Sequence, residues 1–328
     1  MKSRERILAA IDLKQPDQVP FADYVEHEMR KKIMVKEDFT EVEFATTIGF
    51  DAINIDDFVS PVFCKRRQLN GQDYILDGLI KTDKDLNLMV FPDPTDESFY
   101  DPAKRFIEKN ADQDLAIYAI CRFGISGVNY SMGIDGLSYA LYENPKLIDK
   151  VLDRYVEWNC QVLERINNIG IDFIISYDNI AYNNGPLVSP QVFREIFVPK
   201  IKQIDDVCRV PWITHMDGNI MPIMEDILSM GVSGVHPIEP NCMDLKTVKE
   251  IYGDRVCLWG NIDLRYTLTR GTPEEVEKEV KQRIAEAGPR GGYILGSANG
   301  LPEYCKLENI WAMARAVKKY GKYPLDLK

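Results

Sequence analysis

The chain has 328 residues, of which 45% are hydrophobic and 28% charged, and its formal net charge is -11 at pH 7. This composition indicates a globular protein, and an acidic chain without a long basic run is unsuited to binding nucleic acid. The seven scattered cysteines lack a Cys-x-x-Cys pair and no window holds about 18 consecutive apolar residues, so we expect reduced thiols, no export, no membrane span and a cytoplasmic location.

Eight short apolar runs recur along the chain, and helical patterns separate most of them. In chain order the predicted strands are VPFADYV, FDAINID, LAIYAIC, DFIISYD, VPWITHM, VSGVHPI, VCLWGNI and GGYILGS. Strands that are apolar on both faces and alternate with helices are typical of a parallel sheet covered by helices. Eight such units predict an α/β fold, a (β/α)8 TIM barrel, built as one domain over residues 1–328.

Residues 60–112 are too long for a simple connection after the second predicted strand. We expect an insertion there, with a small hairpin and a helix, and its place after a strand end makes it a candidate lid over the barrel mouth. The rest of the chain contains no low-complexity linker and no internal repeat, so a second domain is not indicated.

Polar residues stand at the ends of the predicted strands from the second onward. In a TIM barrel the carboxyl ends of the strands face the active site, so these residues predict one shared pocket. Two of them, Asp178 and Tyr177 after the fourth strand, are the predicted catalytic residues. The predicted substrate-binding residues are Asp56, Asp57, Arg122, Asn179, Tyr182, Asn261 and Asn299.

His215 and Asp217 follow the fifth strand and, being two residues apart, point the same way. Neighbouring strands lie about 4.8 Å apart, so Glu239 or His236 after the sixth strand could complete a set of nitrogen and oxygen ligands. The set of His215, Asp217 and Glu239 suits zinc or another divalent ion. The alternative is a hydrogen-bonded pair that holds the turn, with Asp217 accepting the amides of the following Gly-Asn-Ile as a helix cap.

Other residues near the strand ends have structural interpretations. His236 is expected to be a buried, hydrogen-bonded histidine, and Asp263 a cap or an ion-pair partner of Arg265. Aromatic residues in barrel strands belong to the core more often than to a pocket. Tyr177 and Tyr182 flank a Gly/Asn-rich loop on the active face, so we expect these two to stack a flat substrate.

Four stretches together resemble the uroporphyrinogen decarboxylase superfamily. They are RERILAAIDLKQPDQVP, HMDGNIMPIMEDILSMGVSGVHPIEP, LWGNID and YILGSANGLPEYCKLENIWAM. They keep their order over nearly the whole chain and are most similar to the cobamide-dependent methyltransferase branch. The resemblance implies the same (β/α)8 barrel that the strand pattern predicts.

Departures from the family motifs bear on the activity. The decarboxylases clamp a substrate with eight carboxylates through an RQAGR motif, and this chain has ADYVEHEMRKK at that position. They also carry a histidine in a Gly-His-Gly sequence, and this chain has Asn299 there. Thiol methyltransferases of the family hold zinc with His-x-Cys and a distant cysteine, which match His215, Asp217 and Asn299. Oxygen ligands make a harder Lewis acid, which suits activation of a methyl ether.

The resemblance therefore implies a corrinoid-dependent methyltransferase similar to the methyltransferase I components of anaerobic O-demethylase systems. A methyl group would pass from a small-molecule donor, such as an aryl methyl ether, to Co(I), while Asp178 or Tyr177 neutralises the leaving phenolate. The chain lacks an Asp-x-His-x-x-Gly cobalamin motif, so a separate corrinoid protein is the expected partner. The alternatives are a uroporphyrinogen decarboxylase-like decarboxylase and a methylcorrinoid:tetrahydrofolate methyltransferase.

Overall fold

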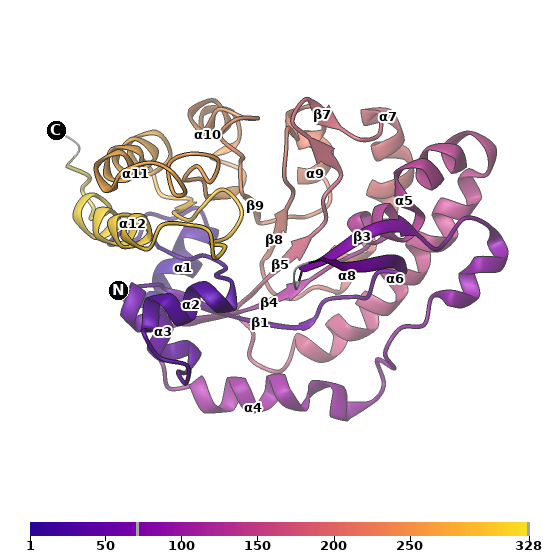
Figure 1. The fold of residues 1–328 in the computed structure, drawn as a ribbon, viewed down its shortest axis with the longest axis horizontal. Coiled ribbons are helices and arrows are strands. Elements are labelled where there is room, and N and C mark those ends of the chain that lie inside the picture. The colour runs from indigo at the N-terminus through magenta and orange to yellow at the C-terminus, as the bar shows by residue number, and fades with distance from the viewer. Residues whose placement is uncertain (70–71, 327–328) are drawn as a thin grey trace.

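A seven-stranded parallel sheet forms the centre of the computed structural model, which describes residues 1–69 and 72–326 (Figure 1). Residues 70–71 of the predicted insertion and 327–328 of the predicted domain lie outside the described residues. The second to eighth predicted strands are all observed. In sheet order they are β1 (Ala52–Phe58), β4 (Ala116–Cys121), β5 (Phe173–Tyr177), β8 (Trp212–His215), β9 (Gly234–His236), β10 (Cys257–Trp259) and β11 (Tyr293–Ile294).

The first predicted strand, residues 19–25, is not a regular strand. It makes isolated bridges to the chain after β11, where the Ala22 amide donates to the Leu295 carbonyl at 3.1 Å and the Leu295 amide to the Pro20 carbonyl at 2.9 Å. Pro20 has no N–H of its own, so a continuous ladder cannot form there. On its other side the segment accepts one hydrogen bond, from the Asp51 amide to the Phe21 carbonyl at 2.7 Å. A closed eight-stranded barrel remains a prediction.

Helices precede the sheet and connect its strands. The Ser-Pro and Thr-Pro starts are confirmed, since Ser189 accepts the Val192 amide at 3.2 Å and Thr272 forms a capping box with Glu275. None of the described helices is both long and apolar enough to span a bilayer. The helices outside the insertion are α1 (Ser3–Ile11), α2 (His27–Met34), α3 (Glu41–Ile48), α5 (Ile125–Glu143), α6 (Pro145–Ile166), α7 (Pro190–Val192), η3 (Phe193–Phe197), α8 (Val198–Val207), η4 (Met221–Ile223), α9 (Met224–Leu228), α10 (Leu245–Tyr252), α11 (Pro273–Ala287) and α12 (Leu307–Tyr320).

Two hydrophobic clusters pack on the sheet. The larger one joins the strands to the surrounding helices, and the smaller one contains Tyr118, Phe173 and Trp259 together with residues of α1. α1 lies at the amino ends of the strands, because Arg4 pairs with Asp172 just before β5 at 2.6 Å and Arg6 pairs with the carboxylate just before β1. The carboxyl ends of the strands are thus left for the site.

The segment between β1 and β4 contains the predicted hairpin and helix. β2 (Cys64–Leu69) and β3 (Gln72–Gly78) pair antiparallel, and η1 (Asp83–Leu88), η2 (Glu97–Tyr100) and α4 (Asp101–Asn110) follow. The hairpin packs on α5 (Figure 1), where the amide of Phe63 donates to the Ser131 hydroxyl at 2.9 Å. A Cβ at Gly78 would lie 2.3 Å from the Met132 backbone, so only glycine permits this approach. A lid function remains a prediction.

Candidate functional site

Asp217 is the centre of a hydrogen-bonded group at the carboxyl ends of the strands. Its carboxylate accepts the Asn179 amide nitrogen at 2.9 Å and the Asn299 amide nitrogen at 3.0 Å, and the Asp217 backbone N–H donates back to the Asn179 Oδ1 at 2.9 Å. His215 Nε2 lies 3.5 Å from Asp217 Oδ1. Burial acts to raise the pKa of Asp217, but His215 and the two amides outweigh it and hold that pKa below its ordinary value. The structure therefore brings four predicted site residues together around an ionised carboxylate.

The second imidazole of the site belongs to His236, which pairs with His215 in the register of β8 and β9. The two Nδ1 atoms lie 2.6 Å apart, and His236 is buried. Burial first, and the charge of His215 second, hold the pKa of His236 well below its ordinary value. His236 is therefore a neutral ring, and its expected role as a buried, hydrogen-bonded histidine is confirmed.

Glu239 does not join the pair formed by His215 and Asp217. Its Oε2 accepts the Gly218 amide at 3.0 Å and its Oε1 accepts Arg265 at 2.8 Å. Among the residues that the structure describes, no group of three or more His, Cys, Asp or Glu side chains is arranged to hold a metal ion. The predicted zinc ligands do not fit as a set, and no step of the chemistry is derived through a metal.

The predicted cap at Asp217 needs a correction as well. The amide of Gly218 donates to Glu239, and the amide of Asn219 donates to the Tyr182 carbonyl at 2.9 Å. Gly218 has a φ of 81°, and a Cβ there would lie 2.7 Å from the Tyr182 carbonyl oxygen. The turn after β8 is thus tied to the loop of Tyr182 and to Glu239, and the Asp217 carboxylate remains on the open side.

Asp178, a predicted catalytic residue, follows β5 in sequence, and its side chain lies beside the first residues of α5. Its two carboxylate oxygens accept the backbone amides of Phe123 and Gly124, both at 3.1 Å, and of Ser126 at 3.4 Å. The side chain is buried, and burial raises its pKa. This geometry supports a structural role, holding the turn between β4 and α5.

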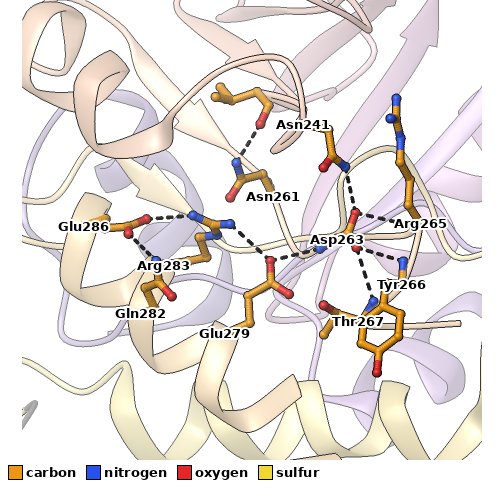
Figure 2. A network of polar contacts seen from close by, with 12 residues as sticks. Asn241, Asn261, Asp263, Arg265, Tyr266, Thr267, Glu279, Gln282, Arg283 and Glu286 are labelled. Atoms are coloured by element: carbon orange, nitrogen blue, oxygen red, sulfur yellow. Dashed lines mark hydrogen bonds and ion pairs between the residues drawn. The ribbon is translucent and has the colours of Figure 1, made fainter. Parts of the chain in front are cut away.

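Arg122 lies one residue after β4 and is also turned into the protein. Its guanidinium donates to the Ser60 carbonyl, and its Nε is buried without a hydrogen-bond partner among the described residues. Burial lowers the pKa of Arg122, and Asp178 opposes that effect. Asn261, after β10, is likewise fully buried. Its Nδ2 donates to the Ile238 carbonyl at 2.6 Å (Figure 2), and its Oδ1 has no hydrogen-bond partner in the part of the chain that the structure describes.

Two of the predicted site residues are tyrosines. The Tyr177 ring lies 4.6 Å from the His215 ring, and burial, followed by the charges of Tyr24, Asp23, Asp217 and Asp56, raises the pKa of Tyr177. Its hydroxyl therefore stays protonated. Tyr182, in β6 (Ala181–Tyr182), faces solvent with 64% of its surface exposed, and β7 (Gly185–Pro186) pairs with it.

Asp23 is a buried acid near the site that sequence reasoning missed. Its carboxylate accepts the backbone amide of Ser297 at 2.6 Å and the Ser297 hydroxyl at 3.1 Å. Burial, partly offset by these hydrogen bonds, raises the pKa of Asp23 to about 7. The signal was present, because Asp23 and Tyr24 end the first predicted strand, but only the ends of strands two to eight were considered.

Three cavities at the carboxyl ends share residues and form what we call the mouth. The cavity of 250 Å3 shares Asn299 with the cavity of 300 Å3. It also shares Tyr24 with the cavity of 470 Å3. Asp56 and Asp57, exposed at the end of β1, line the 470 Å3 cavity. Burial and the charge of Asp56 raise the pKa of Asp57. The main side chains lining the mouth are Tyr24, Glu26, Arg30, Glu41, Asp56, Asp57, Tyr182, Asp217, Glu239, Asp263, Arg265, Asn299 and Tyr304.

The loop after β10 is held by a network of charges (Figure 2). Asp263 accepts the amides of Arg265 at 3.1 Å and Tyr266 at 2.8 Å, so its predicted cap is confirmed. The Asp263 amide donates to Glu279 of α11 at 3.2 Å, and Glu279 pairs with Arg283 at 3.3 Å. α11 thereby fixes the loop that carries Arg265 into the mouth.

Comparison with known proteins identifies the family. A family model described as Uroporphyrinogen decarboxylase (URO-D) matches residues 76–320. The chain belongs to this family. The predicted superfamily is confirmed. A solved structure, "methyltransferase from Methanosarcina mazei", superposes with a TM-score of 0.77 over 98% of this chain and 99% of that one, at 20% identity, which supports the fold.

Relatives of this family member include two kinds of enzyme. "Methylcobamide:CoM methyltransferase MtaA" of Methanosarcina barkeri is 26% identical over 175 residues, 53% of this chain and 49% of MtaA. "Uroporphyrinogen decarboxylase" of Alkalilimnicola ehrlichii is 24% identical over 267 residues, 76% of this chain and 70% of the relative. The chain thus spans about half the length of MtaA. Both relatives are enzymes, which supports enzymatic activity here, and the first is a methyltransferase of the predicted branch.

Proposed function

We propose that this family member transfers a methyl group from a methylated small molecule to the Co(I) of a corrinoid carried by a separate protein. Similarity to MtaA, whose name specifies a methylcobamide, supports corrinoid chemistry. The absence of an Asp-x-His-x-x-Gly motif from the sequence supports a corrinoid bound elsewhere. The proposed partners are therefore a methyl donor and a corrinoid protein.

The charge of the mouth is the observation that favours methyl transfer over decarboxylation. Arg30 pairs with Glu41 and donates to the Val25 carbonyl at 2.7 Å, and Arg265 pairs with Glu239. Both guanidinium groups that line the mouth are thus already paired with glutamates of the protein. Among the described residues, no lysine or arginine pairs with the carboxylates of Asp56, Asp57 and Asp217, and a substrate with many carboxylates would be repelled.

The chain's own residues bind and orient the donor in this proposal. The Co(I) electron pair attacks the methyl carbon in line with the bond that breaks, so the donor must present its methyl group outward, toward the corrinoid protein. An aryl methyl ether is one compatible donor. Its leaving phenolate would require a proton or a hydrogen bond, and Tyr177, protonated beside His215, is the predicted catalytic residue still available after Asp178 is taken by backbone amides.

The test is methylation of free cob(I)alamin by the purified full-length protein under anaerobic conditions. The donors are 4-methoxybenzoate, choline and methyltetrahydrofolate, and the readout is the absorbance change from cob(I)alamin to methylcobalamin. Donor-dependent methylation by the protein is expected. Methylation from methyltetrahydrofolate alone would favour the folate alternative, and release of CO2 from uroporphyrinogen without any methyl transfer would establish the decarboxylase instead.

A further inference from the structure

We propose that the donor carries its methyl group on a positively charged nitrogen or sulfur, and that Tyr24, Tyr182, Asp56 and Asp217 form the binding site for this onium group. The inference rests on the proposed function, since it names the substrate class of the same site. It is carried by two features of the mouth: carboxylates with which no lysine or arginine of the described residues pairs, and exposed tyrosine rings.

The carboxylates leave the mouth with an excess of negative charge. Asp217 is held as a carboxylate by His215 and by the amides of Asn179 and Asn299. None of these three partners is a lysine or an arginine. Asp56 is exposed at the end of β1 on the 470 Å3 cavity. Because Arg30 and Arg265 are already paired with glutamates, a cation is the ligand charge that this field attracts.

The tyrosines supply the apolar side of an onium site. Tyr24 lines two of the three cavities, and Tyr182 and Tyr304 have 64% and 69% of their surfaces exposed at the mouth. Aromatic faces attract quaternary ammonium groups through their quadrupole. Rings combined with carboxylates therefore match a methylated cation better than a neutral ether, which gains nothing from the charge.

Transfer from an onium donor balances without a further reactant. Co(I) gives an electron pair to the methyl carbon, and the electron pair of the C–N or C–S bond returns to nitrogen or sulfur. The donor leaves as a neutral tertiary amine or thioether, and the corrinoid becomes methyl–Co(III). The positive charge of the leaving atom already weakens the bond, so the step needs no proton donor and no three-ligand metal site. The carboxylates act in binding rather than in the transfer itself.

The test compares choline with 3,3-dimethyl-1-butanol, which has the same shape without the charge, by calorimetric titration into the full-length protein. We expect choline to bind about tenfold more tightly than the alcohol at low salt. Asp56→Asn and Asp217→Asn should weaken choline binding several-fold and leave the alcohol unchanged. Asp12→Asn, at the opposite end of the strands, is the matched control and should bind choline like the native protein. Equal binding of the two compounds, or tighter binding of 4-methoxybenzoate, would overturn the inference.

Methyl transfer separates this inference from the proposed function. If 4-methoxybenzoate methylates cob(I)alamin and choline neither binds nor reacts, the proposed function stands and the onium site is wrong. If choline binds in a charge-dependent manner and no donor methylates cob(I)alamin, the onium site is supported and the proposed methyl transfer fails. Asp56 is exposed, so Asp56→Asn keeps the test decisive if Asp217→Asn does not fold.

Discussion

The Nδ1 atoms of His215 and His236 lie 2.6 Å apart and form a hydrogen bond. Two ring nitrogens can form this bond only if one of them carries hydrogen and the other does not. With the pKa of His236 far below its ordinary value, we expect the His236 ring to stay neutral between about pH 5 and about pH 8. The check is the set of histidine 15N shifts, assigned with His236→Gln. A His236 signal that titrates within that window would contradict the structure.

Asp178→Ala should destabilise the protein by about 2–4 kcal/mol, because buried backbone amides at the start of α5 lose their acceptor. Asp178→Asn keeps one acceptor oxygen and should cost clearly less. The measurement is urea unfolding followed by circular dichroism. A variant Asp178→Asn that folds like the native protein but loses all methyl transfer would restore the predicted catalytic role.

Asp23→Asn should change how stability depends on pH. The folded Asp23 keeps its proton up to about pH 7, whereas the unfolded chain releases it near the ordinary value of 3.8. Unfolding therefore releases a proton in this window, and the native protein should lose on the order of a few kcal/mol relative to Asp23→Asn as pH rises from about 4 to about 7. Urea unfolding at several pH values measures the difference. A constant difference would mean that Asp23 is ionised in the folded protein throughout.

Arg265→Gln should strengthen choline binding by about two- to fivefold at low salt, since Glu239 loses its positive partner and faces the 300 Å3 cavity. The gain should shrink as salt is added. Calorimetric titration at two salt concentrations measures both effects. Weaker choline binding in Arg265→Gln would show that Arg265 itself contacts the donor, which favours an anionic one.

Arg283→Met should destabilise the protein by about 3–5 kcal/mol. It leaves Glu279 and Glu286 without their shared cation although only 13% and 15% of these side chains are exposed. The control is Arg290→Met, whose exposed pair with Asp254 should contribute about 0–1 kcal/mol. Thermal and urea unfolding compare the two. Similar losses in both variants would show that the network in Figure 2 is no stronger than a surface pair.

The sequence predicted the strands well where burial alone decides them. β4 and β5 are apolar on both faces, and their runs in the sequence show it. The segment 19–25 has the same apolar pattern, but Pro20 interrupts the ladder, and its bridge partner Leu295 lies near the other end of the sequence. The strand ends were equally informative. Asp217 and Asn299 were both predicted because they follow strands, and their side chains are in contact.

Side-chain partners were harder to predict because competing donors lie far away in sequence. Glu239 looked available for a metal, but Arg265 and the Gly218 amide satisfy both of its oxygens. Asp178 looked free at a strand end, but the backbone turn into α5 presents unpaired amides to it. Both outcomes depend on how loops from different strands approach one another, which hydrophobic periodicity does not encode.

The position of α1 across the amino ends of the strands has a kinetic consequence. In the proposed function, both reactants must then approach from the carboxyl end, where the mouth opens, and the proposed corrinoid protein is far larger than the donor. Once that protein covers the mouth, the donor can neither enter nor leave. Turnover should therefore be sequential and ordered, with the methyl donor binding first and the demethylated product departing last.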